Sequence, residues 1–167
     1  VTTGFFGTAP LNPMLTVTGH KEDAYKLMAQ TKCPSWLYPV TQGATSIWER
    51  WDSYTREKGF GGNNSMNSFN HYSLGAVCEW LYMYVLGIMR DEDQPGYKHF
   101  TAQPQIGPWE SADGYFETPY GTIRAGWKKA DGGCTYHLTV PANTSATVLL
   151  PDGQIREVGS GDYCWNL

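Results

Sequence analysis

Apolar positions recur at helical spacing in the first half of the chain and at strand spacing in the second half. In residues 70–88, the positions Leu74, Val77, Leu81 and Val85 fall on one helical face, because they are three or four residues apart. Apolar residues also occupy most of the other positions, a pattern typical of a helix that other helices enclose. The sequence therefore predicts a buried helix here.

Two shorter helices are predicted before it. The first covers Leu11–Val17 and ends at Thr18-Gly19, a pair typical of a helix C-terminus. The second covers Lys21–Gln30 and carries two acidic residues in its first turn, where they interact favourably with the helix dipole. Together these segments predict a helical hairpin.

Irregular structure is predicted on both sides of a third candidate helix. Prolines within residues 33–45 exclude a continuous helix there, and the glycine-rich residues 56–65 predict a loop. Between them, the pattern that starts at Ser46 is typical of a helix N-terminus.

After residues 91–96 the apolar positions alternate with polar ones, as in strands with one buried face. Turn signals at residues 131–133 and 151–153 separate the strands. The alternating apolar positions are Ile123, Ala125 and Trp127, then Tyr136, Leu138 and Val140, then Ala146, Val148 and Leu150. The pattern predicts a domain boundary near residue 95 and a small antiparallel β-sandwich after it.

Composition excludes several functional classes. The 167 residues contain no run of ~18 apolar residues that could span a membrane, and no secretion signal opens the chain. Twelve basic residues are scattered against 16 acidic ones, giving a net charge of -4, so neither nucleic acid nor a membrane is an expected partner. We expect a soluble mature chain or a piece of a larger one, and its compartment stays unknown.

Aromatic residues and cysteines leave alternatives open. Aromatic residues make up 14% of the chain, including seven Trp and eleven Tyr, which suits either a sugar-binding surface or a β-sandwich core. The four cysteines lie singly, without metal-ligand spacing, so we expect free buried thiols or at most remote disulfides. No motif calls for a metal or another cofactor.

The role of Glu49 in the stretch "GATSIWERWDS" has two possible interpretations, helix capping and catalysis. Ser46 and Glu49 match the S-x-x-E capping box, in which the glutamate bonds back to the start of a helix. Alternatively, a carboxylate between Trp48 and Trp51 resembles one of the two carboxyl groups that a glycosidase needs. Asp52 lies too close to Glu49 to be the second, and we interpret it as a hydroxyl acceptor or ion-pair partner.

His71 is the second candidate, in "NSFNHYSLG" just where the buried helix should begin. A neutral imidazole there could donate a hydrogen bond to a sugar hydroxyl or to Glu49. The alternative is a histidine whose ring nitrogens are satisfied by loop carbonyls.

The order of four blocks adds a family resemblance. These are "TTGFFGTAPLNPML", "CPSWLYPVTQGATSIWERWDS", "MNSFNHYSLGAVCEWLY" and "PGYKHFTAQPQ…ETPYGTIRAGWK". The sequence resembles the C-terminal part of bacterial α-L-rhamnosidases of glycoside hydrolase family 78, which invert the anomeric configuration. The resemblance implies a mixed all-α plus all-β fold. Residues 1–95 would be the last helices of an (α/α)6 barrel, and residues 96–167 a β-sandwich.

The resemblance also implies roles for the candidates. Glu49 matches the catalytic base of the family, His71 matches a rhamnose-binding histidine, and Trp48 would be a pocket wall by its position. The expected partner is a rhamnose-containing glycoside, with no metal and no cofactor.

One part of the family pattern is missing from the sequence. No acidic block that would supply the general acid precedes Glu49, so we expect a C-terminal fragment that is inactive alone and that self-associates through apolar surface. An alternative is a non-catalytic carbohydrate-binding module built on the β-sandwich, and a third role for the sandwich is purely structural. The aglycone and linkage stay open.

Overall fold

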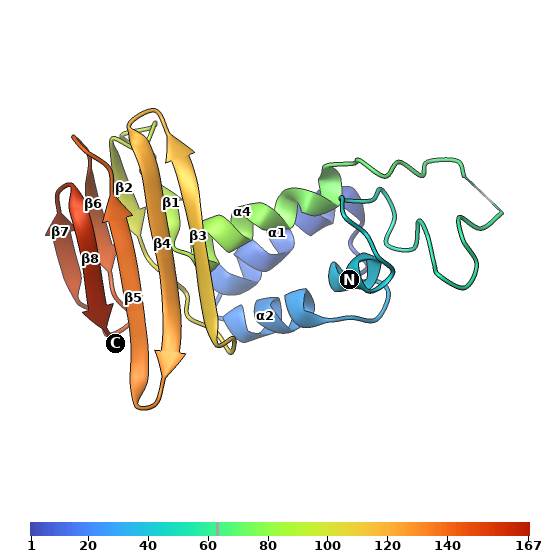
Figure 1. Ribbon diagram of the computed structural model, residues 1–167, viewed down its shortest axis with the longest axis horizontal. Coiled ribbons are helices and arrows are strands. Elements are labelled where there is room, and N and C mark those ends of the chain that lie inside the picture. The colour runs from blue at the N-terminus through green and yellow to red at the C-terminus, as the bar shows by residue number, and fades with distance from the viewer. Residues whose placement is uncertain (63) are drawn as a thin grey trace. The chain divides into compact units, whose positions relative to one another are not determined.

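The computed structural model describes residues 1–62 and 64–167, which divide into two compact units, Val1–Cys78 and Glu79–Leu167 (Figure 1). The first unit is helical and irregular, and the second is dominated by β-strands. The change from helices to strands confirms the predicted fold class. A domain boundary near residue 95 stays a prediction, because compactness alone does not define where a domain ends.

Helices α1 (Gly4–Val17) and α2 (Lys21–Ala29) form the predicted hairpin (Figure 1). Gly19, with φ at +86°, makes the turn between them. Helix α1 begins earlier than predicted and continues through Pro10 and Pro13. Pro10 leaves the carbonyl of Phe6 without its usual helical donor, and Phe6 is 99% exposed, so water can satisfy that carbonyl.

The connection after α2 contains a short helix that the sequence analysis missed, α3 (Leu37–Thr41). Pro39 lies in its first turn, where a helix needs no backbone N–H donor, so the proline does not prevent it. The predicted loop over residues 56–65 is irregular in its described part, with one bridge between Thr55 and Gly59; Asn63 lies outside the described residues.

The predicted buried helix runs over residues 73–85 and changes its winding along the way. It consists of η1 (Ser73–Ala76, a 3₁₀ turn), α4 (Val77–Trp80) and η2 (Leu81–Val85, a π turn). Gly87 ends it, because its φ of +81° suits glycine and an added Cβ would lie 2.4 Å from the backbone nitrogen of Pro104. The helix is therefore shorter at both ends than the apolar pattern predicted.

Eight strands build two four-stranded sheets in the second unit (Figure 1). One sheet has the order β1 (Ile88–Arg90), β2 (His99–Ala102), β6 (Ser145–Leu149), β7 (Ile155–Val158); the other has the order β3 (Ser111–Thr118), β4 (Gly121–Ala130), β5 (Gly133–Val140), β8 (Gly161–Asn166).

The predicted alternation is confirmed, since the inward positions of β4, β5 and β6 are buried. One pairing differs from the antiparallel prediction, because β2 and β6 run parallel. The chain leaves this sheet to build β3, β4 and β5 before it returns as β6, and such a long crossover permits a parallel pair.

Two aromatic side chains tie the second unit's core to the end of its helical segment. The indole N–H of Trp127 donates to the carbonyl of Val85 at 2.8 Å, and the hydroxyl of Tyr136 donates to the carbonyl of Leu86 at 3.3 Å. Both side chains are buried, and burial raises the pKa of Tyr136. Their polar atoms thus satisfy carbonyls that the helix itself leaves open.

The cysteines are free, as one of the alternatives predicted. The expectation that they are buried was wrong, since Cys33, Cys78 and Cys164 are exposed and Cys134 is half-buried. Within the described residues, none of the helices combines the length and the apolar character that a membrane crossing requires.

Candidate functional site

Two segments that are distant in the sequence run side by side and carry the candidate residues. The backbone N–H of Glu49 donates to the carbonyl of Ser68 at 2.9 Å, and the N–H of His71 donates to the carbonyl of Ile47 at 2.9 Å. The hydroxyl of Ser46 donates to the carbonyl of Phe69. These bonds align residues 46–49 with residues 68–71 in an antiparallel manner, so Glu49 and His71 lie on neighbouring segments.

The capping interpretation of Glu49 is wrong. No helix begins at Ser46, because residues 46–53 form bends and a turn. The Ser46 hydroxyl and the Glu49 carboxylate both bond to residues 68–69 instead of to each other's backbone. The long-range pairing satisfies the groups that a local capping box would have used, so the S-x-x-E pattern does not produce a helix here.

One oxygen of the Glu49 carboxylate is fixed. Its Oε2 accepts a hydrogen bond from the backbone N–H of Ser68 at 2.8 Å, while the side chain stays half-buried. Among residues 1–62 and 64–167, no donor bonds to its Oε1. The carboxylate is thus held by one oxygen, and the other is left for a further donor.

His71 is held between two rings. Its imidazole stacks on Phe5 of α1, with ring centroids 4.9 Å apart, and on Tyr72, with centroids 5.7 Å apart. Nδ1 accepts from the backbone N–H of Ser73 at 3.4 Å, which assigns the proton of the neutral ring to Nε2. Within the described part of the chain, Nε2 has no partner, so this N–H is the group that His71 can offer to a ligand.

Four aromatic rings join the two segments to the loop that connects them. Trp48, Tyr54, Phe60 and Phe69 form a closed cycle of edge-to-face contacts, with centroid distances between 5.3 and 6.3 Å. Such contacts contribute about 0.5–1.5 kcal/mol each beyond burial. The cycle stabilises the irregular backbone on which Glu49 lies.

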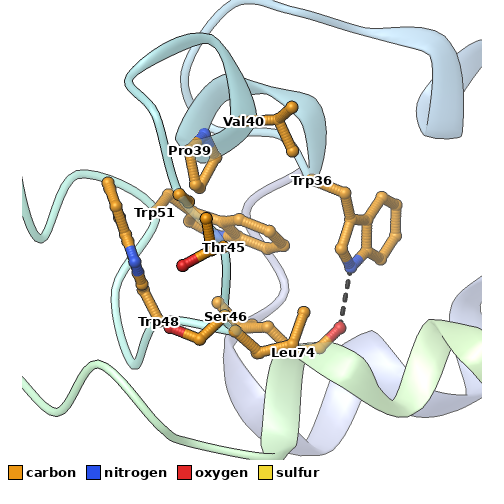
Figure 2. A pocket seen from close by; sticks show the side chains of 10 residues that line it. Trp36, Pro39, Val40, Thr45, Ser46, Trp48, Trp51 and Leu74 are labelled. Atoms are coloured by element: carbon orange, nitrogen blue, oxygen red, sulfur yellow. Dashed lines mark hydrogen bonds between the residues drawn. The ribbon is translucent and has the colours of Figure 1, made fainter.

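Trp48 is 5% exposed and lines an apolar pocket of about 310 Å³. Figure 2 shows it facing Trp51 and Trp36 across the pocket, while the indole N–H of Trp36 donates to the carbonyl of Leu74 at 2.8 Å. Neither Glu49 nor His71 lines this pocket. The structure therefore brings Glu49 and His71 onto adjacent segments but places Trp48 in the wall of a separate cavity.

Two contributors were not identified from the sequence. Phe5 stacks on His71, but nothing in the local pattern distinguishes it from Phe6, its exposed neighbour. Ser68 contributes through its backbone N–H, so its residue type does not indicate this role in the sequence. Among the described residues, no three His, Cys, Asp or Glu side chains converge as metal ligands would.

Models of two protein domains match the chain. The bacterial α-L-rhamnosidase six-hairpin glycosidase domain matches residues 1–85, and the bacterial α-L-rhamnosidase C-terminal domain matches residues 87–163. These matches confirm the resemblance that the ordered sequence blocks indicated.

Curated relatives and solved structures agree with these matches. An α-L-rhamnosidase of Streptomyces avermitilis is 41% identical over 90% of this chain, and one of Formosa agariphila is 41% identical over 89%. The chain spans only 14% and 16% of their lengths. The crystal structure of the Streptomyces avermitilis α-L-rhamnosidase complexed with L-rhamnose superimposes with a TM-score of 0.89 at 37% identity. It covers 100% of this chain, which corresponds to 18% of that one. The crystal structure of the native α-L-rhamnosidase from Aspergillus terreus superimposes with a TM-score of 0.89 at 38% identity, over 100% of this chain and 20% of that one.

Proposed function

Because this chain belongs to the bacterial α-L-rhamnosidases, we propose that it carries the general base and part of the sugar pocket of an inverting glycosidase. The observation that supports this most directly is the pairing of residues 46–49 with residues 68–71, since it gathers Glu49 and His71 from distant parts of the sequence. Each of them keeps one polar atom available for a ligand.

Glu49 would act on water. With Oε2 held by the Ser68 N–H, Oε1 takes a proton from a water molecule, and that water attacks the anomeric carbon of the rhamnoside. The glycosidic bond breaks on the opposite face, where a carboxylic acid protonates the leaving oxygen, and the configuration inverts. In inverting glycosidases the two carboxyl groups lie roughly 6.5–9.5 Å apart, which leaves room for the water.

His71 would orient the sugar. Its Nε2–H donates to a rhamnose hydroxyl, and the stacking on Phe5 and Tyr72 keeps the ring in the plane that allows this. Trp48 would support the site indirectly, because it lines a cavity that neither Glu49 nor His71 lines and belongs to the four-ring cycle that stabilises the backbone of Glu49.

We propose that none of residues 1–167 supplies the general acid of this mechanism, because no acidic block among them matches the one that the family resemblance implies. We therefore propose that the chain alone hydrolyses rhamnosides poorly, because loss of acid catalysis costs roughly 10²–10⁴-fold in rate. Release of rhamnose from an aryl α-L-rhamnoside by the purified chain should stay near background. Robust turnover would refute the proposed division of the active site.

A graft tests Glu49 in a complete site. In the Streptomyces avermitilis enzyme, the part that aligns with this chain is replaced by residues 1–167, and the graft is made with Glu49, with Glu49→Gln and with Glu49→Asp. We expect hydrolysis by the first, loss of at least 100-fold in kcat for Glu49→Gln, and partial recovery for Glu49→Asp. Equal kcat values for the Glu49 and Glu49→Gln grafts would assign the base to another residue.

A second candidate is a carbohydrate-binding module on the sheet of β3, β4, β5 and β8. The ring of Tyr115 is 55% exposed on β3, the guanidinium of Arg124 lies 5.6 Å from its centre, and Thr139 donates to Asp162 at 2.6 Å. Such a mixture of ring and polar groups can hold a sugar. If the sheet binds sugar, Tyr115→Ala in the whole chain abolishes rhamnoside binding measured by calorimetry. If Tyr115→Ala leaves rhamnoside binding unchanged, the carbohydrate-binding role of the sheet is refuted and only the first candidate function stands.

A further inference from the structure

A second pocket, of about 400 Å³, lies beside the segment that carries Glu49, and it is polar where the Trp-lined pocket is apolar. We propose that this polar pocket binds an acidic sugar unit, the one to which the rhamnose is linked; its place next to the rhamnose rests on the proposed function. Its side chains come from three stretches: Cys33 and Tyr38, then Arg50, Asp52 and Thr55, then Lys58 and Phe60, with Gly59, Gly61 and Gly62.

The turn after Glu49 carries two of the pocket's charged residues. The N–H of Arg50 donates to the hydroxyl of Ser53 at 3.2 Å, and that hydroxyl donates to the carbonyl of Arg50 at 3.0 Å. Ser53 is fully buried, so the turn is anchored. Arg50 and Asp52 line the polar pocket from this turn, whereas Trp51 lines the apolar one. Glu49 therefore precedes a turn that separates two different cavities.

The charges favour a ligand with one negative group. Arg50 and Lys58 supply two positive charges and Asp52 one negative charge. Partial desolvation, followed by the Asp52 carboxylate, raises the pKa of the thiol of Cys33, which is otherwise exposed, so Cys33 adds no charge. Within the described chain, neither Lys58 nor Asp52 forms an ion pair. The balance of one positive charge suits a carboxylate, while Asp52 would repel a second charge such as that of a phosphate.

The remaining lining groups suit a sugar ring. Asp52 can accept hydrogen bonds from hydroxyl groups, and Tyr38 supplies a further hydroxyl. Phe60 is 55% exposed and offers a flat apolar surface to the C–H face of a sugar. A simple carboxylate ligand would need only Arg50 and Lys58. The additional hydroxyl-binding groups and the exposed ring therefore indicate a sugar that carries a carboxylate.

The loop of residues 55–61, which lines the pocket, has a hydrogen-bonded backbone and open space at its glycines. Thr55 and Gly59 exchange backbone bonds of 3.0 and 2.8 Å, and the N–H of Lys58 donates to the Thr55 hydroxyl at 3.0 Å. A Cβ at Gly59 or Gly61 would meet nothing within 4 Å. A ligand can therefore approach this backbone closely without displacing side chains.

The test is a titration of the isotopically labelled chain, followed by amide NMR signals, with D-glucuronate, D-glucose and acetate at equal ionic strength. We expect glucuronate to shift the signals of residues 59–62. Its dissociation constant, fitted from these shifts, should be at least tenfold lower than that of glucose or acetate. Arg50→Gln and Lys58→Gln should each weaken glucuronate about tenfold, and Lys128→Gln, on the surface of β4, should have no effect. Amide signals of α1 and α2, which belong to the same unit as the pocket but do not line it, check that each variant stays folded.

Three outcomes overturn the proposal. If glucuronate does not shift residues 59–62, the pocket binds no acidic sugar. If acetate binds as tightly as glucuronate, the pocket is a general anion site and does not recognise the sugar. If Lys128→Gln weakens glucuronate as much as Lys58→Gln does, the binding is non-specific. L-rhamnose is titrated in parallel. If rhamnose shifts His71 while glucuronate does not shift residues 59–62, the proposed function stands and this subsite is removed. If glucuronate shifts residues 59–62 while rhamnose does not shift His71, the pocket binds an acidic sugar but its place beside the rhamnose is removed.

Discussion

Phe5 and Phe6 are adjacent in the first turn of α1 and offer a matched pair for measuring what holds His71. Phe5 is half-buried and stacks on the imidazole at 4.9 Å, whereas Phe6 is 99% exposed. Phe5→Ala and Phe6→Ala change the intrinsic helix propensity equally. The difference between the two variants therefore isolates the contacts of the Phe5 ring.

The structure sets the size of that difference. An aromatic pair contributes about 0.5–1.5 kcal/mol beyond burial, and half-burying a Phe side chain contributes about 1 kcal/mol more. Phe5→Ala should thus lower the free energy of local opening by about 2 kcal/mol relative to Phe6→Ala, roughly a 30-fold change in the opening equilibrium.

The assay is hydrogen exchange at the amide of His71, which is protected by its bond to the carbonyl of Ile47. Exchange in Phe5→Ala should be about 30-fold faster than in Phe6→Ala, and Phe5→Tyr, which keeps the ring, should restore protection. If the two alanine variants exchange within threefold of each other, the stack does not hold His71. The argument that its ring plane is fixed for a sugar then fails as well.

Three further predictions concern stability and association. Gly87→Ala should lower the free energy of unfolding by about 2 kcal/mol or more, because φ is positive and the new Cβ meets the backbone of Pro104; urea unfolding of the second unit measures this. Trp127→Phe should cost about 2–4 kcal/mol in the same assay, since the buried carbonyl of Val85 loses its donor and a cavity forms; a cost below 1 kcal/mol would mean that water replaces the indole. The chain should self-associate with rising concentration, and Phe6→Ser should reduce this in light scattering; a chain that stays monomeric at high concentration would contradict the prediction.

The sequence predicted best the elements whose periodicity follows directly from burial. The alternation through Ile123, Ala125 and Trp127 identified β4, because a strand with one buried face repeats every two residues. The end of α1 at Val17 was predicted for a similar reason, since Gly19 adopts the left-handed backbone that terminates helices. The parallel pairing of β2 with β6 could not be predicted, because it depends on where the chain returns and not on any local pattern.

Glu49 shows why the candidate site was harder to read than the fold. The capping box is a local rule, and it predicted a helix from Ser46. The actual partners of Ser46 and Glu49 are backbone groups of Phe69 and Ser68, which the sequence gives no means to identify. The two flanking tryptophans left catalysis open as an alternative to capping, and only the order of the family blocks favoured it.

The same conflict explains why Glu49 lies on irregular backbone. In a helix that begins at Ser46, the carboxylate would fold back onto the backbone N–H at the start of the helix, in the first turn, and would face away from a ligand. In the bent segment one oxygen is anchored by the Ser68 N–H and the other has no donor among the described residues, so the proposed general base keeps an atom within reach of a water. The four-ring cycle around Trp48 stabilises this bent backbone against its local helix signal. Local preference and global structure therefore disagree at the residue proposed for catalysis, as expected where function constrains the fold.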